Sequence, residues 1–199
     1  MPTISRAEDL AMVGINGGAW TVDLGSDAPV MPTDFSQPPT PWLAAGAISD
    51  AGLKVGFSET STDFTPWGLT SPFRTTVTKS VRTFQIALWE VNRPIVKSVM
   101  FRLPLSAFTP AVSGLTSFAE TASPQPDRRA WLFDVYDGLT MERYFVPSAE
   151  ATARTDLTVK QDAMLAYEVT LTAYPDDAGN TVYHLCTVSI TASGGGDGS

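Results

Sequence analysis

The sequence predicts an all-β fold, in which two antiparallel sheets pack as a β-sandwich or close into a small barrel, with one short flanking α-helix and long loops. Apolar and polar side chains alternate over several segments, which is the pattern of half-buried strands. Helical spacing of apolar residues occurs in one short segment. The 15 glycines and 15 prolines stand mostly between these segments, where they favour turns and loops.

The N-terminal part contains two predicted strands and two predicted arms. The first strand covers residues 19–24, and the Pro-rich sequence that follows predicts an arm over 25–41. After a turn, alternating apolar residues predict a strand over 53–57. The irregular sequence that comes next predicts a second arm over 58–72.

The middle of the chain contains two strands, one helix and a long segment without a clear pattern. Strands are predicted over 73–79 and 81–91. Pro94 stands near the start of a short apolar stripe with helical spacing, so a short helix is predicted there. The turn-rich segment 103–129 predicts a third extended loop.

The clearest element is a β-hairpin with the sequence WLFDVYDGLTMERYFVP at 131–147. Both arms alternate with period 2, and Asp-Gly is typical of a two-residue turn because glycine accepts a positive φ at no cost. Further strands are predicted over 167–174 and 181–190, joined by a PDDAGN turn, and a flexible tail over 191–199. We therefore expect a single domain over 1–190.

Composition excludes several classes of function. The 199 residues carry a formal net charge of -8, and the 13 Lys and Arg residues are scattered, which argues against a nucleic-acid or anionic-membrane binder. No apolar run approaches the roughly 20 residues of a membrane helix, and no export signal is evident. With one cysteine, Cys186, the chain cannot form an internal disulfide, and folding in a reducing cytoplasm is expected.

No catalytic, cofactor or metal site is predicted. The single histidine, His184, has no nucleophile or orienting acid in a recognisable pattern around it. His184 and Cys186 share one face of a predicted strand, but two ligands do not complete a metal site. The protein is therefore not expected to be an enzyme.

Two groups of residues keep both an ordinary and a functional interpretation. Asp134, Glu142 and Glu168 lie inside predicted strands, where they would form either a solvated face or a functional charged surface. Trp42 and Trp67 lie in or beside Pro-rich segments, where they would anchor loops to the core of their own chain or pack on a neighbouring subunit.

An ordered series of short motifs runs through most of residues 13–190, and the series resembles the major tail tube proteins of long-tailed, siphovirus-like bacteriophages. The motifs, in chain order, are GGAWTV at 17–22, PTD at 32–34, W-x-x-x-G-x-I-S-x-x-G at 42–52, PWG at 66–68, P-x-R-T at 72–75, TFQIALWEVNRP at 83–94, W-x-F-D-x-x-D-G at 131–138, V-P-x-A at 146–149 and AYEVTLTAYPDDAGN at 166–180. Segment 103–129 contains no matching motif.

The resemblance implies a β-sandwich subunit that assembles with copies of itself into six-membered rings. Stacked rings would form a hollow tube through which DNA passes without specific binding. Other tail proteins, namely the tape measure, the tail terminator and the tail tip, would be its partners. The protein would belong to the virion tail after assembly in the host cytoplasm.

Within this interpretation the residues singled out above acquire roles. The strand acids Asp134, Glu142 and Glu168 become candidates for an acidic lumen, which would repel DNA phosphates. Candidate contacts between subunits or rings are Trp42, Trp67, Phe64 and Phe35. The arms 25–41 and 58–72 are expected to be mobile in the monomer and ordered by the next subunit or ring. The alternative function is a β-sandwich recognition module of the tail-fibre or adhesin type, binding a glycan or a protein.

Overall fold

The computed structural model describes residues 11–24, 29–110, 114–138 and 140–187. The strands are β1 (Asn16–Asp23), β2 (Leu43–Ala44), β3 (Ile48–Phe64), β4 (Arg74–Leu88), β5 (Arg128–Asp137), β6 (Thr140–Arg154), β7 (Tyr167–Ala173) and β8 (Tyr183–Cys186). Two short helical segments follow β4, the α-helix α1 (Pro94–Phe101) and the 3₁₀ helix η2 (Leu105–Phe108). The prediction of a mainly β fold is confirmed.

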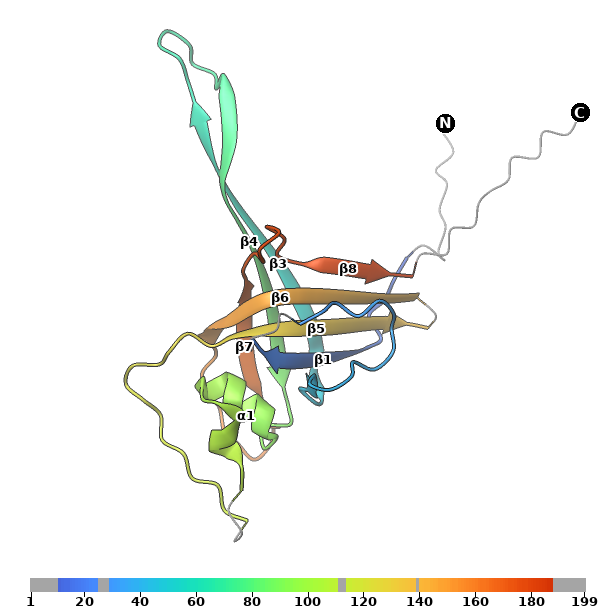
Figure 1. The fold of residues 1–199 in the computed structure, drawn as a ribbon. Coiled ribbons are helices and arrows are strands. Elements are labelled where there is room, and N and C mark those ends of the chain that lie inside the picture. Colours follow the sequence, from blue (N-terminus) through green and yellow to red (C-terminus); the bar gives the residue numbers. More distant parts are fainter. Residues whose placement is uncertain (1–10, 25–28, 111–113, 139, 188–199) are drawn as a thin grey trace, which may run out of the picture.

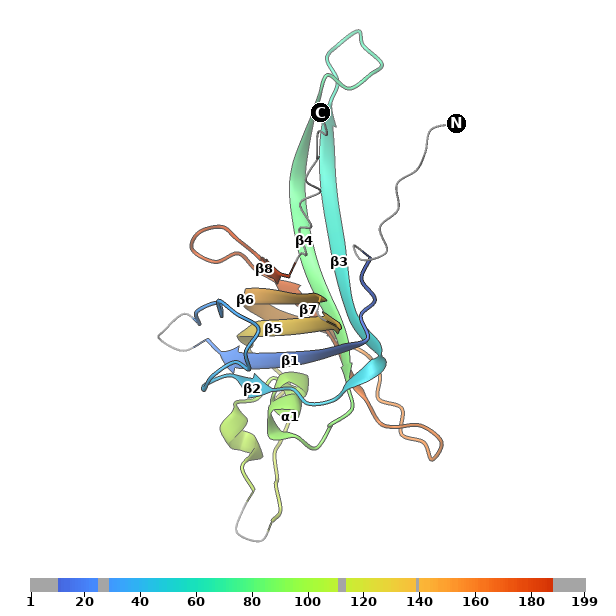
Figure 2. The same cartoon turned by 90° about the vertical axis from the view of Figure 1, so that its right-hand side faces the viewer.

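All of these strands belong to one antiparallel sheet with the order β2-β1-β5-β6-β7-β4-β3, and β8 also pairs with β6. The sheet folds over itself, so that β1, β5 and β6 cross β3, β4 and β7 (Figures 1 and 2). Strand β6 joins the two layers because its first part pairs with β5 and β8 and its last part with β7. The predicted two-layer packing is present, but the layers are continuous through β6 instead of forming two separate sheets.

The main core lies between the two layers and is rich in stacked aromatic rings. Phe133 of β5 stacks on Phe84 of β4 with ring centroids 5.1 Å apart, and on Trp131 at 5.6 Å. Alternate residues of β7, such as Val169 and Leu171, are about 1% exposed and complete this core. The period-2 pattern of β7 therefore reports its burial correctly.

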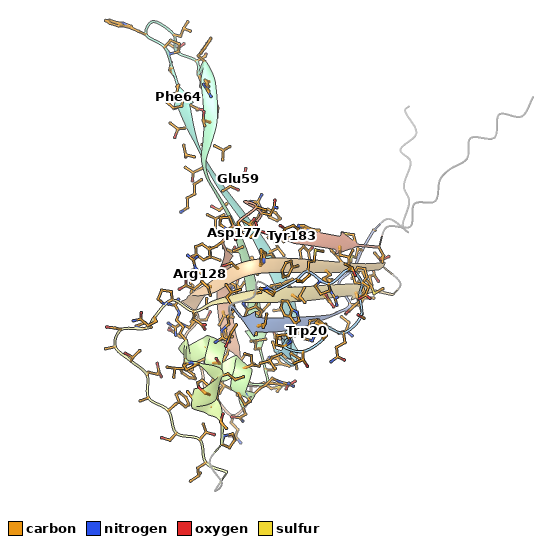
Figure 3. The ribbon with its side chains drawn as sticks, in the orientation of Figure 1. Trp20, Glu59, Phe64, Arg128, Asp177 and Tyr183 are labelled. Atoms are coloured by element: carbon orange, nitrogen blue, oxygen red, sulfur yellow. The ribbon has the colours of Figure 1, made fainter. Side chains whose placement is uncertain are left out.

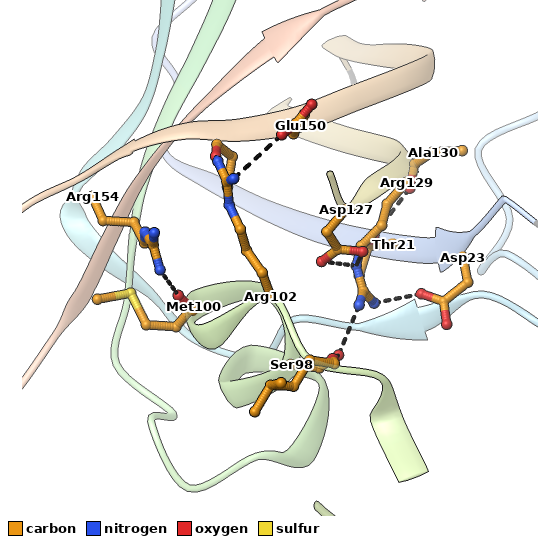
Figure 4. A network of polar contacts seen from close by, with 12 residues as sticks. Thr21, Asp23, Ser98, Met100, Arg102, Asp127, Arg129, Ala130, Glu150 and Arg154 are labelled. Atoms are coloured by element: carbon orange, nitrogen blue, oxygen red, sulfur yellow. Dashed lines mark hydrogen bonds and ion pairs between the residues drawn. The ribbon is translucent and has the colours of Figure 1, made fainter. Parts of the chain in front are cut away.

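Helix α1 covers one end of the core, as predicted. Pro94 occupies its first turn and the backbone N–H of Arg102, in the left-handed region at φ 53°, bonds to the Ser98 carbonyl at its C-terminal end. The helix is held to the sheet by arginines of two strands (Figure 4). Arg129 of β5 donates to Ser98 Oγ at 2.7 Å, and Arg154 of β6 donates to the Met100 carbonyl at 2.7 Å.

The β5–β6 hairpin packs on both of its faces. Leu132 and Phe145 face away from the main core and pack in a second cluster with Trp42 and Met31. The predicted turn is displaced by one residue. Asp137 still pairs with Thr140, and Gly138, at φ 59°, is the first residue of the connection.

The prediction of an irregular arm over 58–72 is wrong. Strand β3 continues to Phe64 and β4 begins at Arg74, so most of this arm is a long β-hairpin, and the predicted strands 73–79 and 81–91 are one strand. The alternation was not visible in the sequence because both faces of a two-stranded ribbon lie in water, which removes the apolar face that such patterns report.

The other predicted loops are partly packed on the body. Within 103–129, η2 places Phe108 beside Phe118, and the ring of Phe118 also contacts Phe101 of α1 at 5.0 Å. The last predicted strand begins as β8, while its end at 188–190 and the predicted tail 191–199 lie outside the described residues. The same holds for the first four residues of the arm 25–41.

Candidate assembly interface

The β3–β4 hairpin projects as a two-stranded ribbon from the body of the molecule (Figures 1 and 3). Glu59 lies where the ribbon leaves the body and Phe64 lies near its end (Figure 3). An isolated two-stranded ribbon is only marginally stable, so cross-strand contacts must hold it together. They include a hydrogen bond from Thr75 Oγ1 to Asp63 Oδ1 at 2.6 Å and an ion pair between Arg82 and Glu59 at 3.3 Å.

The tip of the ribbon, residues 64–73 with the sequence FTPWGLTSPF, has no charged residue and exposes large apolar side chains. Trp67 is completely exposed, at 104%, and Phe73 is 80% exposed. The tip is nevertheless ordered by its backbone, since the N–H of Phe73 donates to the Phe64 carbonyl at 2.9 Å and that of Leu69 to the Pro66 carbonyl at 3.2 Å. Exposed apolar clusters of this kind are typical of protein interaction sites.

The outer edge of β3 is a second candidate surface. Along the described chain β3 pairs with β4 on one side and with no strand on the other. Its 17 residues therefore present unpaired backbone groups over a length that monomeric proteins usually protect. The strand at the opposite end of the strand order, β2, has only two residues. Strand β3 is thus the long open edge of the sheet.

The face of β4 and β7 that points away from the core is polar. It carries Glu168 and Thr170 of β7, which stand opposite Ala87 and Gln85 of β4 in the ladder. The Gln85 amide donates a hydrogen bond to the Glu168 carboxylate. Of the three strand acids predicted to face a lumen, Glu168 is the one that lies on this outward face.

Asp134 cannot serve as a lumen charge, which contradicts the prediction for this residue. Its side chain is fully buried and accepts two hydrogen bonds of 2.6 Å from the equally buried Arg143, one from Nε and one from Nη2. The Tyr136 hydroxyl donates a third bond at 2.7 Å. Burial and this bond to the Asp134 carboxylate raise the pKa of Tyr136 to about 12. An acid inside a strand was expected to be solvated, but its arginine partner stands directly opposite on β6.

Arg143 also fixes the Pro-rich arm to the sheet. Its Nη1 donates to the Asp34 carbonyl at 2.6 Å and its Nη2 to the Ser36 carbonyl at 3.0 Å. The ring of Phe35 lies 5.7 Å from the same guanidinium, and Trp42 packs edge-on against Phe145 with centroids 6.2 Å apart. Phe35 and Trp42, both predicted to contact other subunits, are therefore in contact with their own chain. The described part of the arm is anchored.

Glu142 lies at the end of the core-facing side of β6, beside β8. His184 Nδ1 is 3.3 Å from its carboxylate and Cys186 Sγ is 3.9 Å away. Burial, and next to it the interaction with Glu142, raises the pKa of the Tyr144 hydroxyl. The same two causes raise the pKa of the Cys186 thiol, so this thiol stays protonated at neutral pH. Among the described residues no group of three potential ligands could hold a metal ion, and no helix is long and apolar enough to cross a membrane.

Comparison with known families identifies the family of this chain. The family model of phage tail tube proteins matches residues 6–190. The chain belongs to the phage tail tube protein family. It is therefore a structural component of the virion tail and interacts with other tail proteins, and membership of a structural family indicates a non-enzymatic role.

Further comparisons of this tail tube protein are distant. No curated protein matches its sequence at a significant level. Among solved structures 16 chains match. One is a chain of the cryo-EM structure of the anti-feeding prophage baseplate, 6-fold symmetrised, which is 10% identical, with 93% of this chain and 96% of that chain covered and a TM-score of 0.37.

Three structural features of the tail tube protein were not predicted from its sequence. The length of the ribbon was hidden by its polar faces, although the Thr-rich runs on both sides of Trp67 have the β-propensity of strands. The Arg143 clamp, by which Arg143 holds the arm to the sheet, consists of hydrogen bonds to the Asp34 and Ser36 carbonyls. These residues lie 109 and 107 positions from Arg143 in the chain, and the sequence carries no signal for such distant contacts. An apolar groove beside α1 combines three separate segments and was equally invisible.

Proposed function

We propose that this protein is the major tube subunit of a long-tailed, siphovirus-like phage. In this proposal residues 1–190 form one domain, six copies close into a ring, and stacked rings enclose a channel through which DNA enters the host. The observation that carries the proposal is the combination of an open β3 edge with a long projecting ribbon in a member of the tail tube family. A monomer gains nothing from either feature, whereas both are useful in an assembly.

The ring would be closed by strand addition at the open edge of β3. Backbone N–H and C=O groups that have no strand partner in one subunit would bond to the sheet of its neighbour. Such a contact joins two different surfaces of identical subunits, and a heterologous contact of this kind forms a closed ring when its rotation fits. Closing the ring would remove the free edge that would otherwise lead to uncontrolled aggregation.

The channel wall would be the polar outward face of β4 and β7. This face presents Glu168 and threonine hydroxyls, and the net charge of the chain is -8. DNA moves freely only where no Lys or Arg cluster binds its phosphates, and an acidic wall adds repulsion. Glu168 is therefore our candidate lumen charge, while Asp134, buried with Arg143, is not.

The role in the virion would be passive, without catalysis or a cofactor. Subunits would fold in the host cytoplasm and assemble around the tape measure, from the tail tip to the tail terminator. The alternative of a tail-fibre or adhesin-like recognition module is disfavoured, because such a module should protect its edges and need not polymerise.

Electron microscopy of the purified full chain tests this proposal. Concentrated protein, alone and with purified tail-tip complex from the same phage, should form rings or tubes with a central channel, and sedimentation should show the loss of monomer. The Glu168→Gln variant should form the same tubes with a less negative channel. A chain that stays monomeric with the tip complex, together with tails that lack this polypeptide, would refute the tube function.

A further inference from the structure

The structure contains an apolar groove at the end of the body opposite to the ribbon tip. The groove has a volume of about 380 Å³ and lies between the edge strand β2, the start of α1, and η2. Its apolar lining includes Leu43, Ala44, Pro94, Ile95, Leu105 and Phe108. In Figure 2 the ribbon tip and the elements that form this groove lie at opposite ends of the molecule.

We propose that this groove receives the tip of the β3–β4 ribbon, led by Trp67, of a second copy of this chain. The inference rests on the proposed tube function and adds to it the surface on which one ring binds the next. A donor at one end of a subunit and an acceptor at the other repeat from copy to copy, so the contact propagates along an axis. The open stack of a tube requires this kind of contact.

Charge favours a second copy as the occupant. Copies with a net charge of -8 repel each other, so their contact should form where neither surface carries a free charge. The tip residues 64–73 have no charged side chain. The charged side chain at the rim of the groove is Arg93, whose Nε donates to Glu90 Oε2 of the same chain at 2.8 Å. Tip and groove can therefore meet without removing an unpaired charge from water.

Shape and reach agree with this docking. The exposed part of β4 in the ribbon, residues 74–80, is seven residues long, which corresponds to roughly 23 Å of extended chain. Trp67 is the most exposed large apolar side chain of the described residues, and tryptophan is enriched among the residues that dominate binding energy. A single indole side chain at the end of a narrow ribbon fits a pocket better than it fits a flat surface.

Photo-crosslinking in assembled tubes tests the docking directly. Position 67 is replaced by the aromatic photo-reactive residue p-benzoylphenylalanine in the full chain, tubes are formed and irradiated, and the crosslinked peptides are identified by mass spectrometry. We expect crosslinks to residues 43–44, 93–95 or 105–110 of another copy. The same photo-reactive residue at Val159, which is 80% exposed in a different loop, is the matched control and should not reach the groove.

A charge placed in the groove provides the second measurement. Leu43 is 39% exposed, so Leu43→Glu should leave the monomer folded, which circular dichroism verifies, and should lower the crosslink yield from position 67 about tenfold or more. Val159→Glu should not change it. Tubes whose position 67 crosslinks elsewhere, or not at all, overturn the groove while the tube function stands. Failure of the unmodified chain to form any assembly counts against the tube function and the groove together.

Discussion

Removal of Arg143 should destabilise the monomer more than any other single arginine substitution on the sheet. The Arg143 side chain is fully buried and donates to the Asp134 carboxylate and to the Asp34 and Ser36 carbonyls. In Arg143→Met these acceptors lose their donors, and a buried carboxylate keeps only the Tyr136 hydroxyl. Leaving one member of a buried ion pair without its partner typically costs about 3–5 kcal/mol.

The expected cost can be measured as a change in thermal stability. For a chain of this length about 1 kcal/mol corresponds to roughly 2–4 °C in Tm, so Arg143→Met should lower Tm by roughly 6–20 °C. Thermal and urea unfolding followed by circular dichroism measure the effect. The matched control is Arg74→Met on the exposed ribbon, which should stay within about 0.5 kcal/mol of the parent protein.

A double variant separates the charge from the clamp. Replacing both partners, in Arg143→Met with Asp134→Leu, should recover most of the stability, because no unpaired charge remains in the interior. The arm should still be released, since the Asp34 and Ser36 carbonyls have lost their donor, and hydrogen exchange over residues 29–41 should rise. A loss below about 1 kcal/mol for Arg143→Met, or no recovery in the double variant, would refute this account of the clamp.

Three further predictions concern pH and backbone packing. The pKa of Tyr136 is raised from 10.0 to about 12 by burial and by its bond to Asp134, so its contribution to stability is complete below pH 10 and is lost as pH rises towards 12. Tyr136→Phe should therefore flatten the alkaline loss of stability in unfolding curves, and an unchanged curve would contradict this. The pKa of Asp176 is lowered by hydrogen bonds, first from the Tyr183 hydroxyl, so its stabilisation of the turn before β8 is present above pH 3.8 and is lost below it. In Asp176→Asn the protection factors of the β8 amides, which are exchange rates corrected for their intrinsic pH dependence, should no longer change across this range, and a change equal to that of the parent protein would contradict this. Gly17→Ala should lower the free energy of unfolding by about 1–3 kcal/mol, because the added methyl group would lie 2.6 Å from the Asp134 carbonyl oxygen. In the control Gly52→Ala the added methyl group meets no atom within 4 Å, so any loss of stability there comes from the positive φ of 68° alone.

The segments predicted best are those in which the spacing of apolar residues follows directly from the local structure. Strand β7 reads YEVTLTA because its one face is buried and its other face is polar, and the alternation follows. Helix α1 was predicted because Pro94 and a stripe of apolar residues report the same local structure. In both cases the information lies within a few neighbouring residues, which is the range over which sequence patterns act.

The features that were missed depend on residues far apart in the chain. Asp134 was predicted to be exposed because an acid in a strand usually faces water, and only the register of β5 on β6 places Arg143 opposite to it. The ribbon was taken for an irregular arm because neither of its faces packs on the body. Trp67 was singled out from the sequence because it lies in an irregular Pro-containing segment, but its full exposure at the end of the ribbon could only be seen in the structure.

The ordered ribbon changes the physical account of how assembly would be controlled. Mobile arms would delay polymerisation because each would have to become ordered when it binds, at a cost in conformational entropy. Here the ladder of β3 and β4 and the clamp at Arg143 have already ordered most of both arms in the monomer. The delay would then have to come from the weakness of a single contact, since one tip in one groove buries little surface.

A monomer would dissociate quickly, whereas a ring that offers several tips at once would bind its neighbour with the combined affinity of all of them. Stacking should accordingly depend on ring formation, and a variant with an altered β3 edge should lose tubes even though its Trp67 tip is intact. Tubes that grow by addition of single subunits, without rings as intermediates, would contradict this order of events.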